Sequence, residues 1–416
     1  RATNVSNGFA TWGNNHWQHY TWGTQTIFDA FGSTTRQTFN PSWNIEEYGI
    51  YQTMAKAGQW TAWHNGNQEF NDATNTVRFN EAATNLGFGN LTYFSGDIGE
   101  VILYNRELTA AEKQRVNSYL GVKYGLTLAH DYLSGTGTTI YPIAGYNKNI
   151  AGIGRDDCQS LVQKQSKSSN TGALLTMGID NLIGTDNATH SGAFDTNASF
   201  LMWGDNGVAG TVVLPAESPT QCGPPPTADK RLGAIWKVVE TGTIESTKLN
   251  IDLSGAGFSA DYPVYMLVSS DAAFTSYNSI LLTGAGANIY TSNFNFDGTK
   301  YITFAGNTTP PANLCEGNKT LSWWRYTWPW TTKTKNYDIG DQRIAVTVTD
   351  PSNVGYLFNW YPVSYGRSLY IPRNDNNEAA KITTKFQLLD VTNPANKKPA
   401  SGVSFVIYRV DGWWWG

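Results

Sequence analysis

One segment of the chain changes its hydrophobic period halfway, and this change constrains the fold more than any other feature. Residues 95–126 read SGDIGEVILYNRELTAAEKQRVNSYLGVKYGL. Up to Leu103 the segment is rich in β-branched residues and bracketed by turn formers, which predicts a buried strand. From Thr109 onward, apolar residues recur at the spacing of a helix. The predicted apolar face consists of Val116, Tyr119, Leu120 and Tyr124.

The predicted helix has clear signals at both ends. Thr109 is followed three residues later by Glu112, which is the pattern of a capping box. Gly125 is placed to end the helix in the left-handed conformation. We therefore expect a helix over residues 109–125 that docks on the fold to which the strand belongs.

Elsewhere the sequence shows short alternating segments separated by turns. Gly58 and Asn65-Gly66 mark two hairpin turns. The sequence predicts a mostly β protein of tandem β-sandwich domains, the first closed by one short amphipathic helix. The expected domains are residues 1–128, residues 129–310 and residues 311–416. A proline-rich stretch after residue 214 predicts a surface loop.

Composition narrows the class of protein. Charged residues make up 15% of the chain and the formal net charge is −4, with no basic stripe, which argues against nucleic acid as a partner. The 41 Gly, 16 Trp and 22 Tyr residues indicate an extracellular all-β protein. No apolar run reaches the roughly 20 residues that span a bilayer. The three cysteines leave Cys158–Cys222, Cys222–Cys315 and three buried free thiols as alternatives.

Residues 45–125 resemble the C-terminal half of a laminin-G-like, concanavalin-type lectin domain. The resemblance rests on three motifs: WTAWHNG at residues 60–66, GDIGEVILYNREL at residues 96–108, and the capping box of the helix. The continuations VNSYLGVKYGLTL and IAGIGRDDCQSLVQKQSKS resemble a module found beside such domains in large secreted proteins of Bacteroidota. The C-terminal KKPASGVSFVIYRVDGWWW is similar to a further β domain of the same proteins.

The resemblance implies a cell-surface location, export by type IX secretion, and an adhesin role such as that used in gliding motility. It implies surface polysaccharide or glycan, or proteins of the same secretion or surface system, as partners. Compared with that family, we expect the N-terminal half of the lectin-like domain to be incomplete in this sequence, the third domain to be truncated at its C-terminus, and the C-terminal sorting domain to be absent from it. We therefore expect the first strands to be completed by further residues of the polypeptide or by a partner protein.

The sequence contains none of the common catalytic motifs. HExxH, GxSxG, a Walker phosphate loop and a closely spaced carboxylate pair of the glucanase type are all missing. Asp97 and Glu100 are three residues apart, so on a strand they would point to opposite faces. We expect no enzymatic activity, no catalytic residue and no organic cofactor.

Two polar groups are weighed as sites. Asp97, with nearby carbonyl groups, is a candidate calcium ligand, although a structural hydrogen bond explains it more simply. The Arg155-Asp156-Asp157 run is interpreted as a turn between strands rather than a catalytic or metal cluster.

Tryptophan clusters are the candidate ligand-binding or partner-binding residues. Adjacent tryptophans on a strand point to opposite sides, so at least one of each pair must leave its own core. A contact with a partner or an adjoining domain is favoured over a sugar ligand. The candidates are Trp17, Trp22, Trp323, Trp324, Trp413, Trp414 and Trp415.

The sequence thus predicts a non-enzymatic, secreted cell-surface adhesin. The alternatives are an ancillary carbohydrate-binding region of a large polysaccharide-degrading enzyme and a structural stalk.

Overall fold

The computed structural model describes most of the chain. It covers residues 1–416 except 3–6, 13–16, 23–24, 80–83, 90–91, 183–185, 215–227, 260–261, 308–331, 340–341, 350–382 and 391–416. The described part is mostly β, with antiparallel sheets and one α-helix, as the sequence predicts. The chain divides into two compact units, residues 1–309 and 310–416. The division into three domains stays a prediction.

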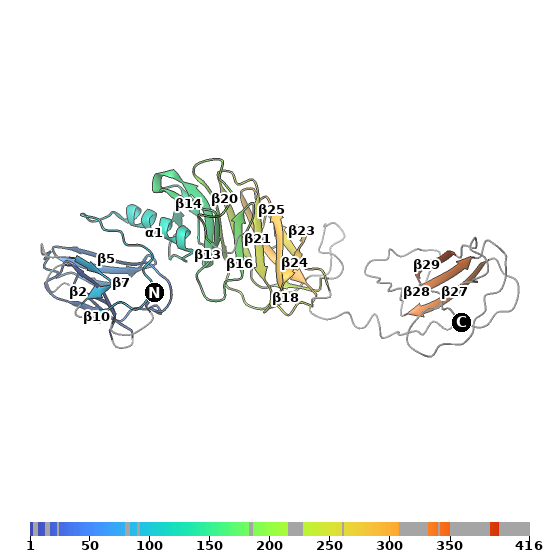
Figure 1. Cartoon of the computed structure of the whole chain (residues 1–416), viewed down its shortest axis with the longest axis horizontal. Coiled ribbons are helices and arrows are strands. Elements are labelled where there is room, and N and C mark those ends of the chain that lie inside the picture. The colour runs from blue at the N-terminus through green and yellow to red at the C-terminus, as the bar shows by residue number, and fades with distance from the viewer. Residues whose placement is uncertain are drawn as a thin grey trace, which may run out of the picture. The chain divides into compact units, whose positions relative to one another are not determined.

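Two sheets form the N-terminal part of the first unit (Figure 1). One has the order β4-β3-β2-β1-β8 and the other the order β5-β6-β7. Their shared core contains Ile27 and Phe39 from the first sheet and Trp60 and Ala62 from the second. A small hairpin, β9-β10, accompanies them. The strands are β1 (Asn7–Trp12), β2 (Trp17–Trp22), β3 (Thr26–Asp29), β4 (Gln37–Phe39), β5 (Tyr51–Lys56), β6 (Gln59–His64), β7 (Asn67–Asp72), β8 (Thr84–Leu86), β9 (Phe88–Gly89) and β10 (Thr92–Tyr93).

Both predicted turns are confirmed. Gly58 joins β5 to β6 with φ 77°, and Asn65-Gly66 joins β6 to β7 with φ 46° and 91°. Left-handed backbone at both residues of a two-residue loop suits the right-handed twist of a hairpin, which explains Asn-Gly there.

The prediction of a buried strand before the helix is wrong, because this segment pairs with no other strand of the described chain. Residues 97–108, which we call the strap, lie in no sheet of the described chain. Its apolar side chains are exposed, with Leu103 63% accessible. The local pattern favours extended backbone, but a strand also needs a neighbour with which to exchange hydrogen bonds.

The helix is confirmed with its caps. α1 spans Ala110–Tyr124, the Thr109 side chain and Glu112 form the capping box, and Gly125 ends the helix at φ 64°. The buried helix residues are Asn117, Ser118, Gly121 and Val122, none of which belongs to the predicted apolar face.

Small residues explain which helix face is buried. A side chain at Gly121 would meet Tyr132 at 2.8 Å, so the glycine permits close approach of that ring. Ser118 accepts a hydrogen bond from the Leu133 backbone N–H at 2.8 Å. Val122 packs with Ile140 and Ile150 of the following region. The helix therefore docks on the central sandwich, and Tyr119 and Leu120 of its apolar stripe pack, partly buried, against the same core.

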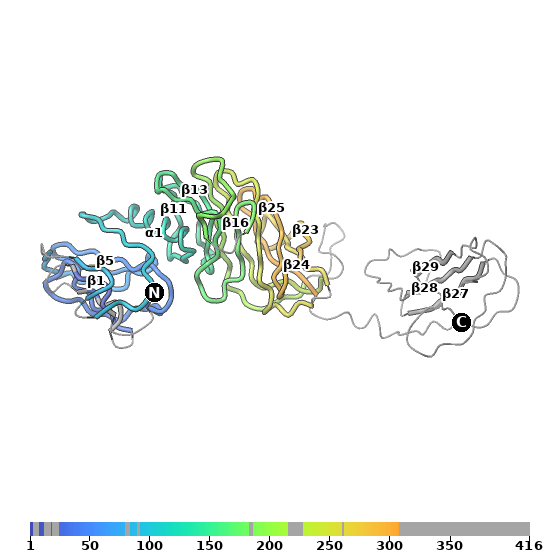
Figure 2. Tube along the Cα trace, in the orientation of Figure 1, coloured from blue at the N-terminus to red at the C-terminus, as the bar shows by residue number. Residues whose placement is uncertain are grey.

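The central part of the first unit consists of a nine-stranded and a five-stranded sheet (Figures 1 and 2). Their inner faces share the largest core, which includes Trp203, Trp236, Met177 and Leu249. The elements are β11 (Tyr132–Leu133), β12 (Thr139–Tyr141), β13 (Lys148–Asp156), the short 3-10 helix η1 (Asp157–Gln159), β14 (Leu161–Gln163), β15 (Gln165–Lys167), β16 (Leu175–Ile179), β17 (Ser199–Asp205), β18 (Thr211–Val213), β19 (Lys230–Leu232), β20 (Trp236–Thr241), β21 (Thr247–Asp252), β22 (Tyr265–Ser269), β23 (Asn278–Leu281), β24 (Thr283–Gly286), β25 (Ile289–Phe294) and β26 (Thr299–Gly306).

The second unit contains one three-stranded antiparallel sheet of order β27-β28-β29 among its described residues. The strands are β27 (Thr332–Ile339), β28 (Gln342–Thr349) and β29 (Thr383–Asp390). In the described part of the whole chain, no helix is long and apolar enough to cross a membrane.

Candidate functional site

The structure does not bring the predicted tryptophans together. Trp17 and Trp22 are the first and last residues of β2, and their side chains lie outside the described part of the structure. Trp323, Trp324 and Trp413–Trp415 lie outside the described residues. Their roles stay predictions.

The polar candidates serve local structure. Arg155 pairs with Asp157 at 2.7 Å. Asp156 is buried at the end of β13, where it accepts hydrogen bonds from the backbone N–H groups of Gly135 and Cys158. Asp97 faces Arg1 and Tyr48. Among the described residues, no group of three or more His, Cys, Asp or Glu side chains could hold a metal ion.

The cysteine alternatives are narrowed. Cys158 is an exposed free thiol, so the structure has neither a Cys158–Cys222 bond nor a buried thiol at residue 158. Cys222 and Cys315 lie outside the described residues.

A cleft of about 1200 Å³ runs along β5 in the N-terminal part, and we call it the β5 cleft. All six residues of β5 line it, and so do all residues of the strap. Consecutive strand residues point to opposite faces, so both faces of β5 can meet one cleft only if the cleft runs along the edge of the strand.

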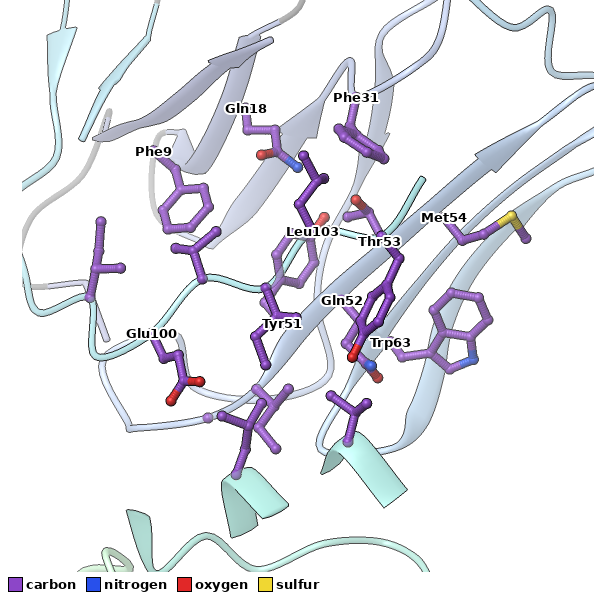
Figure 3. A pocket seen from close by; sticks show the side chains of 18 of the residues that line it. Phe9, Gln18, Phe31, Tyr51, Gln52, Thr53, Met54, Trp63, Glu100 and Leu103 are labelled. Carbon is purple, nitrogen blue, oxygen red and sulfur yellow. The ribbon is translucent and has the colours of Figure 1, made fainter. Parts of the chain in front are cut away.

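The surrounding elements close the sides of the β5 cleft. Figure 3 shows Phe9 and Gln18 of the first sheet, with Phe31 from the turn after β3, on one side of the strap and Trp63 of β6 on the other. The helix contributes Val116 and Leu120, which form part of the apolar stripe that the sequence predicts. Leu120 also packs, partly buried, against the core of the sandwich on which the helix docks.

The strap presents a continuous run of exposed apolar side chains to the cleft. Val101, Ile102, Leu103 and Tyr104 are 43%, 39%, 63% and 43% exposed. Contiguous exposed apolar side chains in a folded protein commonly mark a binding surface.

Ion pairs hold the strap at its two ends and on the helix. The carboxylate of Asp97 lies 3.2 Å from Arg1 Nε, and that of Glu107 lies 2.8 Å from Lys56 Nζ. Glu100 pairs with Lys123 of the helix at 2.8 Å. Both partners in each pair are at least partly exposed, and such pairs contribute only about 0–1 kcal/mol each.

Titration behaviour reflects the same contacts. Burial alone would raise the pKa of Glu100, but Lys123, Tyr124 and Tyr119 together hold this pKa below its ordinary value. Hydrogen bonds from Arg106 and Thr109 lower the pKa of Glu112 to about 2.

The charges of the cleft lining compensate one another. Arg106 forms a bidentate pair with Glu112, at 2.7 and 2.9 Å. The ammonium group of Lys113 lies 4.0 Å from the centre of the Trp63 ring. With the strap pairs, every charged side chain of the lining except Lys113 has a partner of opposite charge, so the lining carries little net charge.

A buried carboxyl lies behind the cleft wall. Asp29 is fully buried and accepts hydrogen bonds from Gln18 at 2.7 Å, Tyr51 at 2.8 Å and the Phe31 N–H at 2.7 Å. Burial raises its pKa to about 6, and the three hydrogen bonds oppose that rise. Gln18, Tyr51 and Phe31 all line the cleft, so Asp29 positions part of its wall.

Comparison with known proteins concerns the region that follows the cleft. A family model for a domain of unknown function matches residues 112–301, a little under half of the chain. Residues 112–301 are similar to DUF8202. The DUF8202-like region comprises nearly all of α1 and the central sandwich, and it excludes β5 and the strap. No curated protein and no solved structure matches the chain.

Sequence reasoning missed the β5 cleft as a site. The sequence predicted the apolar residues of the strap, as part of a buried strand, and the apolar face of the helix. Only the tertiary arrangement shows that the strap is left uncovered beside the edge of β5, and that Val116 and Leu120 line the same cleft.

Proposed function

We propose that the chain is a non-enzymatic binding protein, an adhesin of the cell surface, and that the β5 cleft is its attachment site. The observation that carries this is the row of exposed apolar side chains from Val101 to Tyr104 along one cleft. Concave sites lined by apolar and aromatic groups with a few polar ones are the usual form of binding sites. Secretion through a type IX system, a role in gliding motility and a Bacteroidota origin rest on the sequence resemblance alone.

Attachment can be tested with beads coated with the whole chain and washed over a bacterial surface or a glycan array. Tyr104→Ala should reduce bead retention at least severalfold, because it removes an aromatic ring that is 43% exposed in the cleft lining. Tyr93→Ala is the matched control, since Tyr93 is 77% exposed and does not line the cleft.

Two results would count against this function. One is equal retention of the wild type and Tyr104→Ala. The other is hydrolysis of a polysaccharide by the purified chain with attachment unaffected by either substitution.

A further inference from the structure

The edge of β5 that faces the cleft carries main-chain groups available for pairing. β5 pairs with β6 and with no other described strand. Lys56 and Gln59 flank the two-residue turn at Gly58, so they exchange hydrogen bonds with each other. Alternation along the strand then directs the N–H and C=O groups of Thr53 and Ala55 away from β6 and toward the cleft.

The strap offers a second open backbone on the other side of the same cleft. The backbone of residues 98–105 makes no hydrogen bond with the described part of the chain. An open strand edge is a template for pairing with another chain.

The strap runs in the same direction as β5. Its first residue, Asp97, accepts a hydrogen bond from Tyr48, just before β5, at 2.8 Å. Near its end, Glu107 pairs with Lys56, the last residue of β5. Every strand pair in the described residues is antiparallel. In an antiparallel sheet, two strands that run in the same direction are separated by one strand between them.

The length of the cleft fits one strand. β5 has six residues and is therefore roughly 20 Å long. All six residues line the cleft, so an extended segment of similar length can lie beside the strand.

We propose that the β5 cleft receives an extended segment of a partner protein, which adds as a strand antiparallel to both β5 and the strap. This names the ligand class of the proposed attachment site and rests on that function. Strand addition draws its affinity from main-chain hydrogen bonds and its selectivity from alternate side chains. The segment carries little charge, because every charged side chain of the lining except Lys113 already has a partner of opposite charge. We assign it to another protein, because each strand that the structure describes is already paired in a sheet and none of these strands can fill the cleft.

The test is selection of random ten-residue displayed peptides on the whole 416-residue chain, followed by synthesis of the enriched peptides. The expected peptides lack proline and carry apolar residues at alternate positions. Binding of such a peptide should slow hydrogen exchange of the Thr53 and Ala55 amides at least tenfold in the wild-type chain.

A pair of proline variants distinguishes strand addition from other ways in which a peptide could bind to the β5 cleft. Ala55→Pro removes an N–H that faces the cleft and should weaken peptide binding at least tenfold. Ala57→Pro is the matched control, because Ala57 precedes Gly58 in the exposed turn, where proline is well tolerated. If Ala55→Pro does not fold, the exchange of the wild-type amides decides the question.

Three results would overturn the proposal. The first is the absence of an alternating pattern among the enriched peptides, or unchanged exchange at Thr53 and Ala55. The second is protection of these amides that grows with protein concentration without peptide, which would assign the cleft to a second copy. The third is a glycan that blocks bead attachment and binds equally well to the Ala55→Pro variant. This result would reject a peptide as the ligand of the cleft but would leave the proposed adhesin function in place.

Discussion

Individual side chains were predictable from the sequence where their role is local. Thr109 and Glu112 form the predicted capping box at the start of the helix, and Gly125 ends it in the predicted left-handed conformation. Each of these contacts involves only residues close together in the sequence. Asp29 was not predictable, because its partners Gln18 and Tyr51 come from different strands and meet it only in the folded protein. Burial of an ionisable group is a tertiary property that no short motif encodes.

The raised pKa of Asp29 predicts a pH dependence of stability. The folded state holds its proton up to about pH 6, whereas the unfolded chain releases it near 3.8. This contribution is fully present below about pH 4 and is lost as the pH rises to about 6. The stability advantage of the wild type over Asp29→Asn should therefore shrink by about 2–3 kcal/mol between pH 4 and pH 7.

Urea unfolding at several pH values measures this difference. A constant difference between the wild type and Asp29→Asn would show that Asp29 does not titrate in this range.

At the scale of elements, periodicity predicted a mostly β chain and located the one helix. It failed at the strap, which is unpaired, and it did not indicate which face of α1 is buried. The reason is the same in both cases, because pattern shows which side chains are apolar but not whether a neighbour covers them. The helix is buried through Gly121 and Ser118, which a hydrophobic pattern ignores.

The end of α1 offers a test of close packing. Gly125 has φ 64°, and an added Cβ would lie 2.3 Å from the carbonyl oxygen of Lys167. Gly125→Ala should destabilise the first unit by more than the roughly 1 kcal/mol expected from the left-handed backbone alone. Gly137→Ala isolates the backbone contribution, because Gly137 has φ 94° and no atom within 4 Å of an added Cβ. Equal shifts of the thermal midpoint in the two variants would contradict the Lys167 contact.

At the scale of the whole molecule, composition and turn spacing were sufficient for the mostly β class, which the structure confirms. Composition and turn spacing could not predict the candidate site. It depends on the relation between β5, the strap and α1, which the ion pairs Glu107–Lys56 and Glu100–Lys123 establish across long sequence separations. Neither partner of such a pair is distinguishable from an ordinary surface charge in the sequence.

The central claim is that the β5 cleft is open, with unpaired backbone on both sides. Hydrogen–deuterium exchange of the free chain, resolved to residues 51–64 and 97–108, tests it most directly. We predict that the strap amides and those of Thr53 and Ala55 exchange within seconds. The amides of Trp60 and Ala62, inside the sheet, should exchange at least a hundredfold more slowly. Exchange of the strap as slow as that of β6 would show that the strap is already paired, and that no site for a further strand exists.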